Sequence, residues 1–124
     1  MGYESKLYIV EKTHVVDRYG KKWGDVVAML DLSKYYNLSD VLRNKSKTDC
    51  YIIAEDGNTE INLDRYGDEL TESDLKTVID IMEKDVAEGE NYRRIFPALS
   101  MLKTLEEQKK AGIWGDLVVL HYGY

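Results

Sequence analysis

The strongest constraint on the fold is a change of hydrophobic period about halfway along the chain. Up to residue 63, apolar residues alternate with polar ones or form short runs between turn-forming residues. This pattern is typical of β-strands. From residue 71 onward, apolar residues recur every three or four positions, as they do on one face of an α-helix. The sequence therefore predicts strands first and a helical layer second.

The first half predicts four strands, at residues 3–13, 24–32, 50–54 and 59–63. The last two form a hairpin through Asp56-Gly57-Asn58, because Gly and Asn accept a positive φ at little cost. The run at 24–32 is almost continuously apolar, which is typical of a strand buried on both faces. One helical turn is expected at Ser39–Arg43, with Ser39 as its cap.

The second half predicts two helices and a closing strand. Thr71 followed by Asp74 resembles a capping box at the start of the first helix, which ends at Gly89. The second helix begins near Arg93 and ends at Gly112. Residues 114–122 form the closing strand, expected beside an N-terminal one. The predicted fold class is α+β, with a mainly antiparallel sheet of about five strands and a two-helix layer on one face, in a single domain spanning residues 1–124.

Charge is distributed unevenly along the chain. Residues 55–90 hold thirteen acidic and three basic residues, a net charge of −10, whereas each flank carries +2 within the total of −6. Such a field repels nucleic acid, or imitates it to a protein that binds nucleic acid. No apolar run is long enough to span a bilayer, and no export signal is visible, so the expected location is the cytoplasm without membrane contact.

Reactive groups are few. Cys50 is the only cysteine, which excludes an internal disulfide, and its apolar context favours packing as a small hydrophobe. A metal site could be imagined from His14 and His121 with Cys50 or Asp116, but their spacing matches no metal motif, and no P-loop or GxGxxG is present. The sequence therefore predicts no catalytic residue, no metal and no cofactor.

Two segments echo each other: Trp23-Gly24-Asp25 and Trp114-Gly115-Asp116 each precede an apolar strand. The simpler interpretation is that similar strand entries use similar residues. The alternative is that both corners lie at one edge of the sheet and share an aromatic and acidic surface.

The opening Met-Gly-Tyr-Glu-Ser-Lys-Leu-Tyr-Ile-Val, the closing Trp-Gly-Asp-Leu-Val-Val-Leu-His-Tyr-Gly-Tyr and the Asp64–Asp68 turn resemble small accessory proteins of bacteriophages and prophages. That group has no active site to transfer. The resemblance implies a bacterial host, and small acidic phage proteins include inhibitors of host defence such as anti-CRISPR proteins. The mildly basic flanks depart from a mimic of DNA over the whole surface.

The leading hypothesis is a non-enzymatic phage-type binding protein that inhibits a host nucleic-acid-binding defence enzyme, such as a CRISPR nuclease, without touching nucleic acid itself. Carboxylates would pair with the Arg and Lys that otherwise hold phosphates, and a tyrosine would anchor the contact. The predicted partner-binding residues are Glu55, Asp56, Glu60, Asp64, Tyr66, Asp68, Glu69, Glu72 and Asp80.

Two alternatives stay open. One is a phage accessory or assembly protein that forms a homodimer or larger homo-oligomer, whose acidity serves only solubility. The other is a metal-assisted hydrolase that uses carboxylates with His14 or His121.

Overall fold

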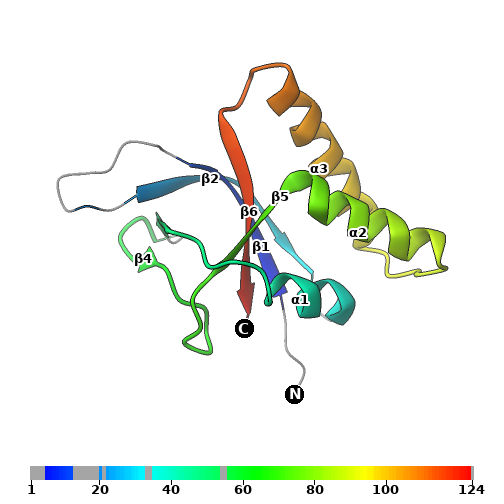
Figure 1. Cartoon of the computed structure of the whole chain (residues 1–124), viewed down its shortest axis with the longest axis horizontal. Helices are drawn as coiled ribbons and strands as arrows, with labels where there is room; N and C mark the ends of the chain where they lie inside the picture. Colours follow the sequence, from blue (N-terminus) through cyan, green and yellow to red (C-terminus); the bar gives the residue numbers. More distant parts are fainter. Residues whose placement is uncertain (1–4, 13–19, 21, 33–34, 54–55, 124) are drawn as a thin grey trace.

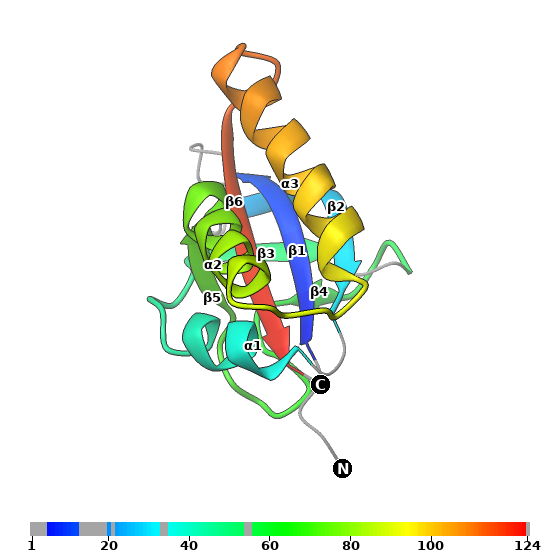
Figure 2. The same ribbon diagram turned by 90° about the vertical axis from the view of Figure 1, so that its right-hand side faces the viewer.

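The computed structural model of the chain describes residues 5–12, 20, 22–32, 35–53 and 56–123. Within these ranges six strands form one sheet, and three helices cover one of its faces (Figures 1 and 2). None of these helices has the length and apolarity needed to cross a bilayer. In chain order the elements are β1 (Ser5–Lys12), β2 (Lys22–Asp31), α1 (Tyr36–Leu42), β3 (Cys50–Ile53), β4 (Glu60–Ile61), β5 (Thr71–Asp74), α2 (Leu75–Ala87), α3 (Ile95–Lys110) and β6 (Asp116–Gly123).

The strand order across the sheet is β4-β3-β2-β1-β6-β5. All neighbours pair antiparallel except β2 and β3, which run parallel through Lys22↔Cys50 and Trp23↔Tyr51. The closing strand β6 pairs with β1 along its whole length, which confirms the prediction that the two ends of the chain meet. The predicted α+β class and mainly antiparallel sheet are confirmed as well.

The two central strands bury side chains on both faces of the sheet. In β1, Leu7 and Ile9 join the core under the helices, whereas Tyr8 and Val10 join a second core on the opposite face. The alternation follows from the period of two in a strand. We call the first group the helix-side core and the second the loop-side core. The loop-side core consists of Tyr8, Val10, Cys50, Ile52, Leu70, Val118 and Leu120.

One stretch of chain crosses the sheet from β5 to β2. Beside β5, Lys47 forms a bridge with Thr71, and the backbone N–H of Thr48 donates to the Leu70 carbonyl oxygen at 2.9 Å. A few residues later the same stretch becomes β3 and pairs with β2. The segment 46–53 therefore spans from β5 to β2 and encloses the loop-side core.

The predicted numbers of strands and helices were wrong. The missed strand is β5, because Thr-Glu-Ser-Asp has no apolar alternation and its pairing comes from β6. The predicted capping box was wrong too: Thr71 lies in β5, and Asp74 is the cap of α2, accepting the N–H of Thr77 at 2.8 Å. The third helix is α1, which starts at Tyr36, so Ser39 lies within it and is not its cap. The ends at Gly89 and Gly112 are confirmed, and both glycines have positive φ.

The prediction that the second strand is buried on both faces was also wrong. Val26 and Met29 of β2 are 42% and 38% exposed. Among the described residues, β3 pairs with β2 only at Lys22 and Trp23. The second half of β2 therefore has no neighbouring strand on that edge. The strands with both faces buried are β1 and β6 at the sheet centre.

The two Trp-Gly-Asp segments flank one end of β1, because Lys12 pairs with Gly24 on one side and with Asp116 on the other. Their tryptophans have different neighbours. Trp114 packs against the helix-side core and donates its indole N–H to Gln108 Oε1 at 2.9 Å, whereas Trp23 contacts the Tyr51 ring.

Replacing Gly24 with Ala should lower the free energy of unfolding by about 1–3 kcal/mol, as expected for overpacking. A Cβ at this position would lie 3.0 Å from Val10 Cγ2 and 3.1 Å from Val10 Cβ, inside the loop-side core. Urea denaturation measures the change. Gly115→Ala is the matched control, since its Cβ would meet only the flexible end of Glu11 at 3.4 Å. Equal stability of the two variants would contradict the packing argument.

Candidate functional site

The sheet separates the predicted partner-binding residues. The segment from Asp56 to Glu69 runs with β4 on one side of the sheet, whereas Asp80 lies on α2 on the other (Figures 1 and 2). Glu72 is part of β5. Glu55 lies outside the described residues. The nine residues therefore do not form one continuous surface.

Several acidic residues of β5 and the helices already have partners within the protein. Glu72 forms an ion pair with Lys12 at 3.0 Å, and Asp80 pairs with Lys76 at 3.1 Å. Further along, Glu83 pairs with Lys103, and Asp85 accepts hydrogen bonds from Tyr35 and Asn37. The helical side thus alternates carboxylates with cations and donors.

On the loop side, two aspartates hold tight turns. Asp56 accepts the Thr59 hydroxyl and the N–H groups of Thr59 and Asn58, and these hydrogen bonds lower the pKa of Asp56 to about 2. Asp64 accepts the N–H groups of Tyr66 and Asp68 at 2.8 and 3.0 Å. Both turns are therefore held by hydrogen bonds to an aspartate side chain.

The second turn is fastened to the sheet and presents its tip to solvent. The N–H of Arg65 donates to the Gly123 carbonyl oxygen at the end of β6, at 3.0 Å. Tyr66 and Leu63 are 54% and 45% exposed. We call the exposed residues Asp56, Glu60, Leu63, Tyr66, Asp68 and Glu69 of segment 56–69 the acidic face.

A cavity of about 410 Å³ opens beside the same turn. Four of the predicted residues line it, together with two cations that follow α1 and two buried residues of the sheet. The lining residues are Arg43, Lys47, Asp64, Tyr66, Asp68, Glu69, Thr71 and His121. Sequence reasoning missed the contribution of Arg43, Lys47 and Thr71, because it arises only when segment 46–48 pairs with β5.

His121 forms part of the floor of this cavity and is almost completely buried. Burial lowers the pKa of His121 to about 4; the charge of Asp64 opposes this shift and that of Arg43 adds to it. Its Nε2 lies 2.9 Å from Ser5 Oγ, and Ser5 in turn hydrogen-bonds Ser39. The imidazole is therefore neutral at pH 7 and fixed by hydrogen bonding. His14 lies outside the described residues.

A second polar cluster lies where segment 46–53 crosses from β5 to β2. Lys12 Nζ lies 3.0 Å from Glu72 and 3.1 Å from Asp49, and Lys22 Nζ lies 2.8 Å from Asp49. Burial would lower the pKa of Lys12, but the hydrogen bonds and charges of Glu72 and Asp49 outweigh it and raise that pKa. Hydrogen bonds from Lys22 and Lys12 lower the pKa of Asp49 to about 2.

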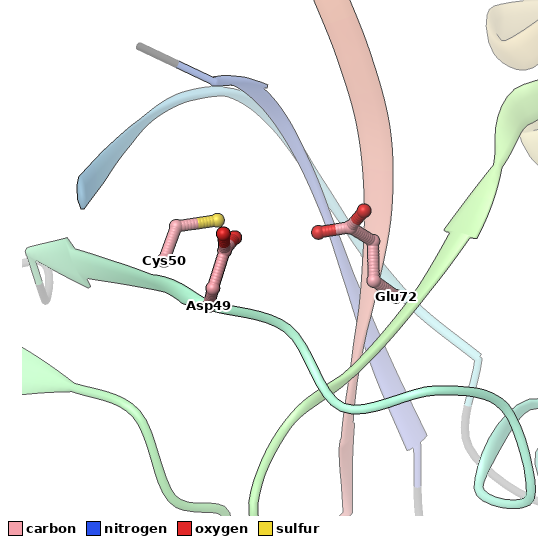
Figure 3. A group of neighbouring side chains, drawn as sticks. All are labelled: Asp49, Cys50 and Glu72. Atoms are coloured by element: carbon pink, nitrogen blue, oxygen red, sulfur yellow. The ribbon is translucent and has the colours of Figure 1, made fainter. Parts of the chain in front are cut away.

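This cluster includes a potential set of metal ligands that the sequence spacing did not reveal. Among the described residues, Asp49, Cys50 and Glu72 bring one ligand atom each within 4.8 Å of the others, and their side chains point toward one another (Figure 3). However, the ammonium groups of Lys12 and Lys22 already pair with the two carboxylates. Burial raises the pKa of the Cys50 thiol, which disfavours the thiolate that a metal requires. The arrangement therefore favours an ion-pair network over a metal centre.

Comparison of the chain with protein-family models, with curated proteins and with solved structures gave no match. The functional argument therefore rests on the geometry of the acidic face and the cavity.

Replacing Lys12 with Met should destabilise the protein by about 1–3 kcal/mol, between the values for exposed and buried ion pairs. The side chains of Lys12 and Glu72 are only 14% and 25% exposed, and the substitution leaves Glu72 without its cation. Thermal or urea unfolding measures this loss, and adding Glu72→Gln should restore part of it. Lys76→Met removes an exposed ion pair and should change stability by no more than about 0.5 kcal/mol. Equal effects of the two lysine substitutions would contradict a structural role for Lys12.

Lowering the pH from 7 to 4.5 should cost about 2–3 kcal/mol of stability through His121. Its pKa falls from an ordinary 6.5 to about 4 in the fold, so the unfolded chain binds the proton first. The contribution is complete above pH 6.5 and is lost as the pH falls toward 4. Urea unfolding at several pH values measures it. His121→Gln should flatten this part of the profile. An NMR titration of the His121 ring with a midpoint near 6.5 would contradict the prediction.

Proposed function

We propose that this protein is a non-enzymatic binding protein that docks its acidic face onto a basic surface of a nucleic-acid-binding protein. The sharpest case is a CRISPR nuclease of a bacterial host, which the bound protein would inhibit. The observation that supports this proposal is the charge of segment 56–69. It carries five acidic residues and one basic residue, Arg65, on the side of the sheet away from the helices.

The turns of this segment favour recognition of a cationic protein. Because hydrogen bonds and the anchor at Gly123 hold the backbone, the carboxylates of Asp68 and Glu69 stay near Tyr66 without a large ordering cost on binding. Carboxylates can receive the Arg and Lys side chains that otherwise hold phosphate oxygens. An exposed Tyr supplies apolar contact area with a hydroxyl at its edge, which suits the centre of an interface.

The proposed contact set is smaller than the charge of the sequence indicated. Glu72 belongs to the Lys12 network, and Asp80 lies with Lys76 on the helical side. Asp56 and Asp64 contribute mainly by fixing their turns. The residues that we expect to touch the partner are Glu60, Tyr66, Asp68 and Glu69. The same negative charge disfavours direct binding of nucleic acid.

Reversing three charges of the acidic face, as Glu60→Lys, Asp68→Lys and Glu69→Lys, should weaken binding to the partner at least about 100-fold. Attraction to a basic surface becomes repulsion at each position. Binding of purified CRISPR nucleases, with and without guide RNA, is measured by surface plasmon resonance, and the affinity of the unmodified protein should fall as salt is added.

The control is a second triple variant on the helical side, Asp80→Lys, Glu88→Lys and Glu107→Lys, which changes the net charge equally. It should bind as the unmodified protein does. Equal weakening by both triple variants would indicate nonspecific attraction and contradict the proposed surface. A defined homo-oligomer in light scattering that neither variant disrupts, with no binding to any nucleic-acid enzyme, would instead support the assembly role.

A further inference from the structure

The cavity beside the acidic turn is lined by side chains of both charges. Its cations are Arg43, which also pairs with Asp40 at 3.8 Å, and Lys47; both follow α1, and we call them the positive wall. The carboxylates of Asp64, Asp68 and Glu69, from the turn before β5, form a negative wall. A ligand that is only an anion would meet the negative wall, and one that is only a cation would meet the positive wall. Charge complementarity therefore favours a ligand that carries both charges.

The floor of the cavity is formed by two buried residues of the sheet. Thr71 and His121 pair across β5 and β6, and each is more than nine-tenths buried. Thr71 donates its hydroxyl to the Leu42 carbonyl oxygen at 2.6 Å, and Ser5 holds the His121 ring. Because the imidazole is neutral at pH 7, the two walls supply the formal charges that a ligand meets there.

The size of the cavity also fits a small organic ligand. A volume of about 410 Å³ falls within the range of small-molecule sites. Most such sites place a few polar groups so that they fix the orientation of the ligand. Here the positive wall can receive a carboxylate and the negative wall an ammonium group. Tyr66 also lines the cavity, where its ring can pack against the ligand.

We propose that this cavity binds a small zwitterion of the α-amino acid or short-peptide class. The ligand carboxylate lies against Arg43 and Lys47, and the ligand ammonium lies against Asp68 and Glu69. This inference does not rest on the proposed protein partner, because it follows from the lining of the cavity alone.

The test is an NMR titration of the intact protein with three matched probes at pH 7. Glycylglycine carries both charges, N-acetylglycylglycine only the negative one, and glycylglycinamide only the positive one. Glycylglycine should produce saturable shifts of the His121 and Tyr66 ring signals below about 10 mM, and either blocked probe should bind at least about tenfold more weakly, as expected for one lost charged contact. No saturable shift with glycylglycine, or equal affinity for all three probes, would overturn the proposal.

Variants that each remove one charge from the cavity test which end of the ligand lies against which wall. Lys47→Gln should weaken the binding of glycylglycine and leave the binding of glycylglycinamide unaffected, because only the former presents a carboxylate. Glu69→Gln should weaken the binding of glycylglycine and leave the binding of N-acetylglycylglycine unaffected. Glu83→Gln, on α2 outside the cavity, is the control and should match the unmodified protein. If neither cavity variant changes glycylglycine binding, the proposed orientation is wrong. The proposed protein partner is tested without any probe, so the two proposals can fail separately.

Discussion

The ammonium group of Lys12 holds together the part of the sheet on which the rest of the molecule depends. It lies between Glu72 of β5 and Asp49, which precedes β3. Without a cation there, two carboxylates would face each other at the point where segment 46–53 leaves β5 for β2, and their repulsion would oppose this crossing. The crossing in turn sets Lys47 beside Thr71 and encloses the loop-side core. The positive wall of the cavity therefore depends on an ion pair that lies outside it.

Charge that is continuous in sequence is not continuous in space. The acidic middle of the chain begins in loops on one side of the sheet, passes through β5, and continues along α2 on the other side. The carboxylates have a different role in each of these places. Asp56 and Asp64 hold turns, Glu72 neutralises Lys12, and Asp80 faces Lys76. Under the proposed function, the charge that a partner would contact therefore comes from a subset of the acidic residues, and structure rather than composition selects that subset.

Local signals in the sequence predicted much of the fold, and long-range pairing explains what they missed. Gly89 and Gly112 end helices because they take positive φ. The predicted capping box was wrong, since Thr71 lies in β5 and Asp74 alone caps α2. By contrast, the Thr-Glu-Ser-Asp strand has no pattern of its own and exists because β6 pairs with it. The apolar run of β2 indicated a strand but not whether it lies at the centre of the sheet. The cavity and the Lys12 network join residues far apart in the chain, so no spacing could reveal them.

The acidic face and the cavity share Tyr66, Asp68 and Glu69, so their occupants are linked. A cationic group of a protein partner and the ammonium of a zwitterion would use the same carboxylates. A partner docked on the exposed carboxylates would not need to contact Arg43 and Lys47. A ligand within the cavity would contact them through its own carboxylate. A ligand that neutralises these carboxylates would lower the affinity of the protein for its partner. By thermodynamic linkage, the bound partner would lower the affinity for the ligand by the same factor. Occupancy of the cavity would therefore regulate docking without any movement of the fold, because the turn already holds both sets of contacts in one geometry.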